Sequence, residues 1–138
     1  MIVRALNILL VDDSPSDRAL VELALGQIKL LNHLQMAEDG EEALALLREP
    51  GNERPDLILL DLNMPGMDGR EFLRVVKADD DLCTIPVVIL TSSVADDDVA
   101  GSYRNHCAGY VRKPVDLDGL VRVVQGISDY WFAIVVPP

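Results

Sequence analysis

The chain has 138 residues with a formal net charge of −11 at pH 7, and 49% of its residues are hydrophobic; this length suits one domain with a sizeable core. The acidic balance argues against binding to nucleic acids, whose phosphates attract clustered lysine and arginine side chains. No stretch reaches the roughly 18 uninterrupted apolar residues of a membrane helix, and residues 1–7 show no signal-peptide layout, so we expect a cytoplasmic protein with no membrane partner.

The first half of the chain alternates strand-like apolar runs with helical periodicity. Residues 8–11 are continuously apolar, and Ser14 and Pro15 then suit the N-cap and first position of a helix that ends near residue 30. A short strand over 34–37 and a second helix after Asp39 follow. The helical positions expected to face the core are Leu20, Leu23, Ala24 and Ile28 in the first helix, and Ala43, Leu44, Leu46 and Leu47 in the second.

The second half repeats this alternation, which predicts βα units around a parallel sheet. Residues 57–60 and 87–90 are apolar runs typical of strands buried on both faces. We expect a helix over about 68–77, a strand over 110–112, and a last helix from about 116 whose buried positions are Leu117, Leu120, Val121, Val124, Ile127 and Trp131.

Three consecutive aspartates, Asp96 to Asp98, are expected to open the fourth helix, where negative charge suits the helix dipole. A metal site is the alternative reading. Adjacent side chains on a helix point in different directions and make a poor chelate, so we favour the helix start.

Polar residues follow four of the strand-like runs, and this is the main functional signal. They are Asp12 and Asp13, then Asp61, Thr91 and Lys113. The carboxyl ends of parallel strands converge on one crevice, so we expect these groups to meet there. Crowded carboxylates raise one another's pKa, and a hard divalent cation relieves the repulsion; ligation by oxygen alone favours Mg²⁺. The alternative, that each aspartate is a solvated loop residue, suits any one of them better than the whole set.

This donor set indicates phosphoryl chemistry. Asp61 occupies the central position and is the best candidate for a carboxylate that attacks phosphorus. Mg²⁺ and Lys113 would spread the charge on the transferred oxygens, and the Thr91 hydroxyl would donate to one of them. The Lys113–Pro114 bond is a candidate cis peptide that would aim Lys113 into the crevice.

The same residues resemble those of the two-component response-regulator receiver family, the CheY-like domains. The matching motifs are Asp12-Asp13, the Asp-Leu-Asn-Met-Pro-Gly-Met-Asp-Gly run from Asp61, Thr91-Ser92-Ser93, and residues 109–114. The resemblance covers about residues 6–127. It implies a doubly wound α/β fold, a flavodoxin-like (βα)5 three-layer sandwich whose five-stranded parallel sheet has the order 2-1-3-4-5. Residues 1–138 would be a single receiver domain, with 127–138 as a C-terminal extension.

The resemblance also implies roles for individual residues. Asp61 would be the phosphoacceptor. Asp13, Asp61 and the Asn63 backbone carbonyl would bind Mg²⁺, with Asp12 acting largely through water. Thr91 and Lys113 would stabilise the phosphoryl group, and Thr91 and Tyr110 would form the switch pair. Such a protein phosphorylates and dephosphorylates itself but is a signalling protein rather than an enzyme.

A narrower resemblance concerns the partner. Residues 13–17, the loop at 50–55 and the Tyr-Trp-Phe tail resemble stand-alone response regulators paired with bacterial and cyanobacterial phytochrome histidine kinases. The alternatives are a receiver for a different kinase, a phosphate sink that drains a relay, and a metal-dependent phosphatase. The phosphatase class expects a second aspartate two residues after the nucleophile, where this chain has Asn63.

The C-terminal tail carries more large apolar residues than one helix face can bury. Exposed apolar patches mark interfaces, and a twofold homodimer is the simplest way to cover one. The alternative is that the tail folds back on its own domain. The expected dimer residues are Tyr130, Trp131, Phe132, Ile134 and Val135.

Overall fold

The computed structural model describes residues 6–28, 32–93 and 95–133, except for the side chains of residues 131–133. Within these ranges, five strands alternate with five helices. The strands are β1 (Leu6–Val11), β2 (Asn32–Ala37), β3 (Leu57–Leu60), β4 (Val87–Thr91) and β5 (Gly109–Arg112). The helices are α1 (Pro15–Gln27), α2 (Gly40–Arg48), α3 (Gly69–Ala78), α4 (Asp96–Arg104) and α5 (Leu117–Ala133).

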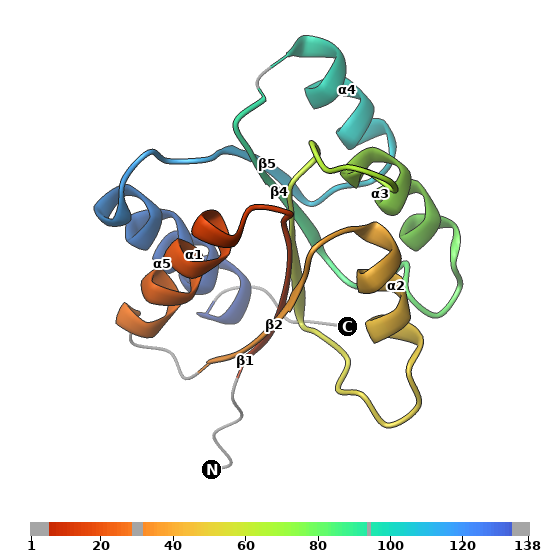
Figure 1. Cartoon of the computed structure of the whole chain (residues 1–138), viewed down its shortest axis with the longest axis horizontal. Helices are drawn as coiled ribbons and strands as arrows, with labels where there is room; N and C mark the ends of the chain where they lie inside the picture. The colour runs from red at the N-terminus through yellow and green to blue at the C-terminus, as the bar shows by residue number, and fades with distance from the viewer. Residues whose placement is uncertain (1–5, 29–31, 94, 134–138) are drawn as a thin grey trace.

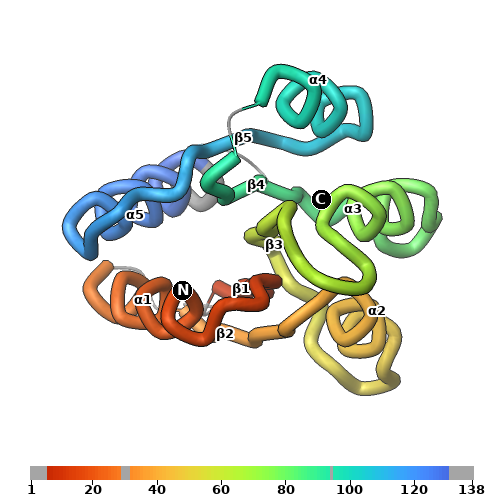
Figure 2. Tube along the Cα trace, turned by 45° about the horizontal axis from the view of Figure 1, so that its top comes forward, coloured from red at the N-terminus to blue at the C-terminus, as the bar shows by residue number. Residues whose placement is uncertain are grey.

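All strands pair in parallel in one sheet with the order β2-β1-β3-β4-β5, which confirms the predicted fold. Helices α1 and α5 cover one face, and α2, α3 and α4 lie on the other (Figure 1). Figure 2 shows the same division along the Cα trace. Right-handed crossovers between parallel strands place helices on both faces whenever the strand order reverses, as it does here after β2.

Alternation along the strands supplies two hydrophobic cores. In β1, Leu9 and Val11 belong to the core beneath α2 and α3, whereas Ile8 and Leu10 belong to the core beneath α1 and α5. All four residues of β3 are buried. The uninterrupted apolar runs are therefore explained by a sheet that is covered on both faces.

Side-chain caps fix where the first three helices begin. Ser14, Asp39 and Asp68 are the N-cap residues, and each accepts a hydrogen bond from a backbone amide three residues later. Pro15 follows Ser14 at the start of α1, as predicted. The Asp96–Asp98 triplet lies in the first turn of α4, which is also as predicted.

One expected core position is wrong. Leu23 was expected to face the core, but 57% of its surface is exposed. The buried positions of α1 are Val21, Ala24 and Leu25, with Ile28 just beyond the helix. The sequence contains two overlapping apolar stripes, and the one that includes Val21 and Leu25 packs on the sheet.

The N-terminus of α3 presses directly on the backbone that carries Asp61. A Cβ atom placed at Gly69 would overlap the backbone carbonyl of Asp61 and would lie 2.7 Å from the Cα of Leu62. The Gly69 amide donates to the carbonyl of Leu62 over 3.0 Å. Glycine is therefore required here because two backbones approach closely.

We expect Gly69→Ala to lower the free energy of unfolding by about 2–3 kcal/mol, because the inserted methyl group must push two backbone segments apart. Urea denaturation followed by circular dichroism measures this change. Gly26→Ala is the matched control, since a Cβ there meets nothing within 4 Å. The control should be neutral or stabilising by up to about 1 kcal/mol; a Gly69→Ala protein as stable as the control would contradict the steric argument.

Candidate functional site

The carboxyl ends of β1 and β3 bring three carboxylates together. One oxygen from each of Asp12, Asp13 and Asp61 lies within 4.8 Å of the others. Asp12 and Asp61 are buried, whereas Asp13 is exposed. The Asp61 amide donates to the carbonyl of Val11 over 2.9 Å, so the backbone hydrogen bonding of the two strands continues into the site. Strand pairing, not local loop structure, sets the spacing of the acids.

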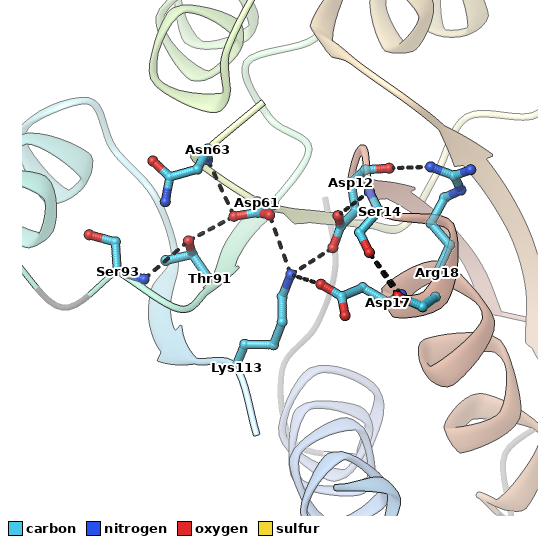
Figure 3. Close-up of polar contacts among 10 residues, drawn as sticks. Asp12, Ser14, Asp17, Arg18, Asp61, Asn63, Thr91, Ser93 and Lys113 are labelled. Carbon is cyan, nitrogen blue, oxygen red and sulfur yellow. Dashed lines mark hydrogen bonds and ion pairs between the residues drawn. The ribbon is translucent and has the colours of Figure 1, made fainter. Parts of the chain in front are cut away.

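Lys113, just after β5, supplies the positive charge of the cluster (Figure 3). Its ammonium nitrogen donates to Asp12 Oδ2 at 2.8 Å, to Asp17 Oδ2 at 2.9 Å and to Asp61 Oδ2 at 3.3 Å. Burial alone would lower the pKa of Lys113, but the hydrogen bonds to Asp12 and Asp17 outweigh it and raise the pKa above its usual value. The ammonium therefore stays charged throughout the physiological range.

Burial has the larger effect on Asp12. It raises the pKa of this carboxyl group above the usual value even though Lys113 and the Ser14 amide both donate to it. Independently of this pKa, the one ammonium of Lys113 contacts three carboxylates, so it does not fully compensate the negative charge of the cluster. The remaining negative charge and the oxygen-only donors of Asp12, Asp13 and Asp61 fit a hard divalent cation.

The other oxygen of Asp61, Oδ1, accepts hydrogen bonds from the end of β4 and from the loop after β3. The Thr91 hydroxyl, fully buried at the end of β4, donates to Asp61 Oδ1 over 2.7 Å. The backbone amide of Asn63, in the loop after β3, donates to the same oxygen over 3.3 Å. Together with the Lys113 contact, these bonds engage both oxygens of Asp61 and fix the orientation of its carboxylate.

Tyr110 lies on β5, and its hydroxyl group reaches the loop after β4. It donates to the backbone carbonyl of Ser93 over 2.8 Å, and the ring packs against the core on the α2 and α3 side. Ser93 is also joined to the site, because its amide donates to Thr91 Oγ1 over 3.4 Å. The predicted switch residues, Thr91 and Tyr110, are thus linked through one loop residue.

The predicted cis bond is wrong. None of the described peptide bonds is cis, so the Lys113–Pro114 bond is trans. Trans is the lower-energy isomer before proline. No unusual isomer is needed, because the long side chain of Lys113 already reaches the carboxylates from the end of β5.

Sequence reasoning missed an ionic network beside the site. Arg70 Nε, on α3, donates to Asp98 Oδ1 over 2.7 Å, and the Ser93 hydroxyl donates to Asp98 Oδ2 over the same distance. Arg70 also donates to Asn63 Oδ1 at 3.4 Å. Asp98 was predicted only as a helix-start charge, and the sequence holds no signal that pairs it with an arginine 28 residues away.

Asp17 was also missed as a partner of Lys113. It stands in the first turn of α1, five residues after Asp12, and its amide donates to the Ser14 hydroxyl over 3.2 Å. A helix that starts directly after the acidic pair must hold its first turn at the same crevice. The place of Asp17 in this first turn could have predicted the contact, because it puts an acidic side chain near the expected ammonium of Lys113.

We expect Asp98→Asn to lower the free energy of unfolding by about 1 kcal/mol at pH 7, since both its partners lie near the surface. Hydrogen bonds from Arg70 and Ser93 hold the pKa of Asp98 below its usual 3.8. A lowered folded-state pKa means that this stabilisation is present above about pH 4 and is lost as the pH falls through the lowered value.

Urea denaturation at pH 7 and at acidic pH tests this expectation. Asp97→Asn is the matched control, because Asp97 lies in the same first turn but is exposed. Equal stabilities of the two variants at pH 7 would show that the Arg70–Asp98 pair contributes nothing.

Proteins of known family and structure are similar to this chain in sequence and fold. A family model for the response regulator receiver domain matches residues 8–125. Over 135 residues the chain is 44% identical to response regulator Rcp1 of Synechocystis sp., covering 95% of this chain and 92% of that protein. The crystal structure of the phosphorylated cyanobacterial phytochrome response regulator RcpA matches with a TM-score of 0.90 and 40% identity, over 98% of this chain and 99% of that one. The Mn²⁺-bound form of Rcp1 matches with a TM-score of 0.85 and 43% identity, over 96% and 98% of the two chains.

Proposed function

Because the chain belongs to the family of response regulator receiver domains, we propose that it is a phosphorylation switch in which Asp61 accepts a phosphoryl group from a histidine kinase. One observation carries the proposal. Asp61 is a buried carboxylate between the Lys113 ammonium and the Thr91 hydroxyl. Thr91 donates to its Oδ1 atom, and Lys113 donates to its Oδ2 atom. A positive charge and a hydroxyl donor beside a nucleophilic oxygen are what a transferred phosphoryl group requires.

The proposed step forms a bond between an Asp61 oxygen and phosphorus while the bond from phosphorus to the donor imidazole nitrogen breaks. The nitrogen keeps the bonding electron pair. In the later dephosphorylation step, water attacks phosphorus and loses a proton, the bond to Asp61 breaks, inorganic phosphate leaves and the carboxylate is restored. Lys113 and Thr91 hold the phosphoryl oxygens in both steps through charge and hydrogen bonding.

The acidic cluster and the Mn²⁺-bound relative indicate a divalent-metal site. We assign Mg²⁺ to it, held by Asp13, Asp61 and the backbone carbonyl of Asn63, with Asp12 acting through water. The hydrogen bond from the backbone N–H of Asn63 to Asp61 keeps this residue next to the carboxylates, which supports the assignment. When bound, Mg²⁺ supplies charge neutralisation for the phosphoryl oxygens.

The switching element is proposed to be the loop after β4. Thr91 would leave Asp61 Oδ1 for a phosphoryl oxygen, and the Ser93 amide, which is bonded to Thr91, would be drawn with it. Tyr110 holds the same residue through its carbonyl, so a shift of Ser93 would release or redirect the ring. An added dianion that recruits a hydroxyl and an ammonium biases such a two-state loop.

The proposed phosphoryl donor is a phytochrome-type kinase, and the exchange would take place in the cytoplasm. The support is the similarity to response regulator Rcp1 and to the cyanobacterial phytochrome response regulator RcpA. A different kinase or a phosphate sink uses the same site, so partner identification separates these options. A small-molecule phosphatase is disfavoured, because Asn63 stands where that class needs an acid.

We further propose a homodimer through α5 and the C-terminal extension. A shallow apolar groove of about 370 Å³ lies between β5 and α5, and its lining includes Val88, Val111, Val123, Ile127 and Tyr130. Tyr130 is 53% exposed at its edge. The side chains of Trp131 and Phe132, and residues Ile134 and Val135, lie outside the described structure, and their place in the interface rests on the sequence alone.

We expect wild-type protein with Mg²⁺ to take up radiolabelled phosphate from a phytochrome-type histidine kinase, and Asp61→Asn to take up none. Omission of Mg²⁺ should abolish labelling of the wild type. Labelling by acetyl phosphate alone would retain the acceptor and exclude that kinase. Labelling of Asp61→Asn equal to that of the wild type would refute the acceptor assignment.

Tyr130→Glu should shift the protein from dimer to monomer, because the groove would then have to bury a charge. Sedimentation equilibrium at micromolar concentration measures the shift. Leu23→Glu is the control, as Leu23 is 57% exposed on α1, away from the groove. A wild-type monomer, or a Tyr130→Glu dimer as tight as the control, would rule out this interface.

A further inference from the structure

The Lys113 ammonium is shared among three carboxylates. This sharing affects how well it can bind the oxygens of a phosphoryl group on Asp61. An ammonium has three N–H donors. They are directed to Asp12, Asp17 and Asp61 at 2.8, 2.9 and 3.3 Å. Each donor of the ammonium is therefore matched to one carboxylate before any phosphoryl group arrives.

Asp17 differs from the other two partners. The side chains of Asp12 and Asp61 are 2% and 10% exposed, whereas that of Asp17 is 38% exposed. Asp17 lies outside the group of carboxylates that could share a metal ion, which comprises Asp12, Asp13 and Asp61. Its backbone amide is held by the Ser14 hydroxyl, so its place at the edge of the site is set by the start of α1. Figure 3 shows Asp17 approaching Lys113 from α1, on the opposite side from Thr91.

We propose that Asp17 competes with the phosphoryl group on Asp61 for the Lys113 ammonium, and so limits how tightly the site holds phosphoryl oxygens. This inference rests on the proposed function of Asp61. Phosphorylation removes the charge of one Lys113 partner and adds about two negative charges in its place. The ammonium serves the new oxygens fully only to the extent that Asp17 releases it, and the Asp17 charge also repels them.

A purely orienting role for Asp17 predicts the opposite. If Asp17 were needed to aim the ammonium, its removal would weaken the hold on phosphoryl oxygens. Asp12 already fixes the ammonium, since it is buried, makes the shortest of the three contacts and lies directly beside Asp61. The geometry therefore favours competition over orientation.

The test compares the affinity of wild type, Asp17→Asn and Glu22→Gln for beryllium fluoride in the presence of Mg²⁺, by isothermal titration calorimetry. Beryllium fluoride adds to a carboxylate as a phosphoryl mimic. Glu22 is an exposed acid on the same helix, so Glu22→Gln matches the loss of charge. We expect Asp17→Asn to bind about fivefold more tightly, the size of a partly exposed ion pair, and Glu22→Gln to stay within about twofold of wild type.

Two further readouts separate competition from a structural effect. The gain in Asp17→Asn should shrink at high salt, because a partly exposed charge is screened, whereas a loosened helix would not respond. Thermal melting establishes that the variants are folded.

The outcomes are distinct from those of the acceptor test. Wild-type protein that binds no beryllium fluoride, like Asp61→Asn, would refute the proposed function itself. Wild type that binds, with Asp17→Asn equal to Glu22→Gln or weaker than wild type, would overturn the competition while leaving the acceptor intact. A salt-independent gain would also overturn it.

Discussion

The ion cluster around Lys113 is the interaction on which the site depends. Burying Asp12 and Asp61 side by side costs free energy, and the ammonium offsets part of that cost through contacts at 2.8 and 3.3 Å. Because Lys113 follows β5 while the acids follow β1 and β3, the cluster forms only when the sheet is complete. Burial opposes the charge of Lys113, but the hydrogen bonds to Asp12 and Asp17 outweigh it and raise the pKa of Lys113, whereas burial raises the pKa of Asp12.

Ser93 connects this cluster to the rest of the molecule. Its amide donates to Thr91, its hydroxyl donates to Asp98, and its carbonyl accepts from Tyr110. Through Asp98 it also reaches Arg70 on α3. In the proposed switch, a displacement of Thr91 would therefore reach β5 and α4 through hydrogen bonds that are all made by one residue.

The sequence predicted the backbone framework well, because burial on both faces of a parallel sheet leaves a strong apolar signal and because caps such as Ser14 act locally. It also predicted which groups meet at the sheet edge, since parallel strands bring their carboxyl ends together. It could not predict that Arg70 meets Asp98 or that Asp17 meets Lys113, because such pairs depend on where helices cross. The prediction that Leu23 is buried was wrong for a related reason. Periodicity identifies an apolar stripe, but tertiary packing determines which of two overlapping stripes faces the sheet.

The close approach at Gly69 makes the site mechanically asymmetric. On one side, Asp61 is fixed by the strand hydrogen bond to Val11 and by α3, whose first residue leaves no room for the Asp61 backbone to move. On the other side, the backbone of Thr91 is paired with β5, but the Thr91 hydroxyl and Ser93 are held by individual hydrogen bonds to side chains and loop backbone groups. In the proposed switch, a phosphoryl group on Asp61 would therefore meet a fixed backbone on the α3 side, and the displacement it causes would be directed toward α4 and β5. The rigid contact at Gly69 would then help to determine which surface a partner of the phosphorylated protein recognises.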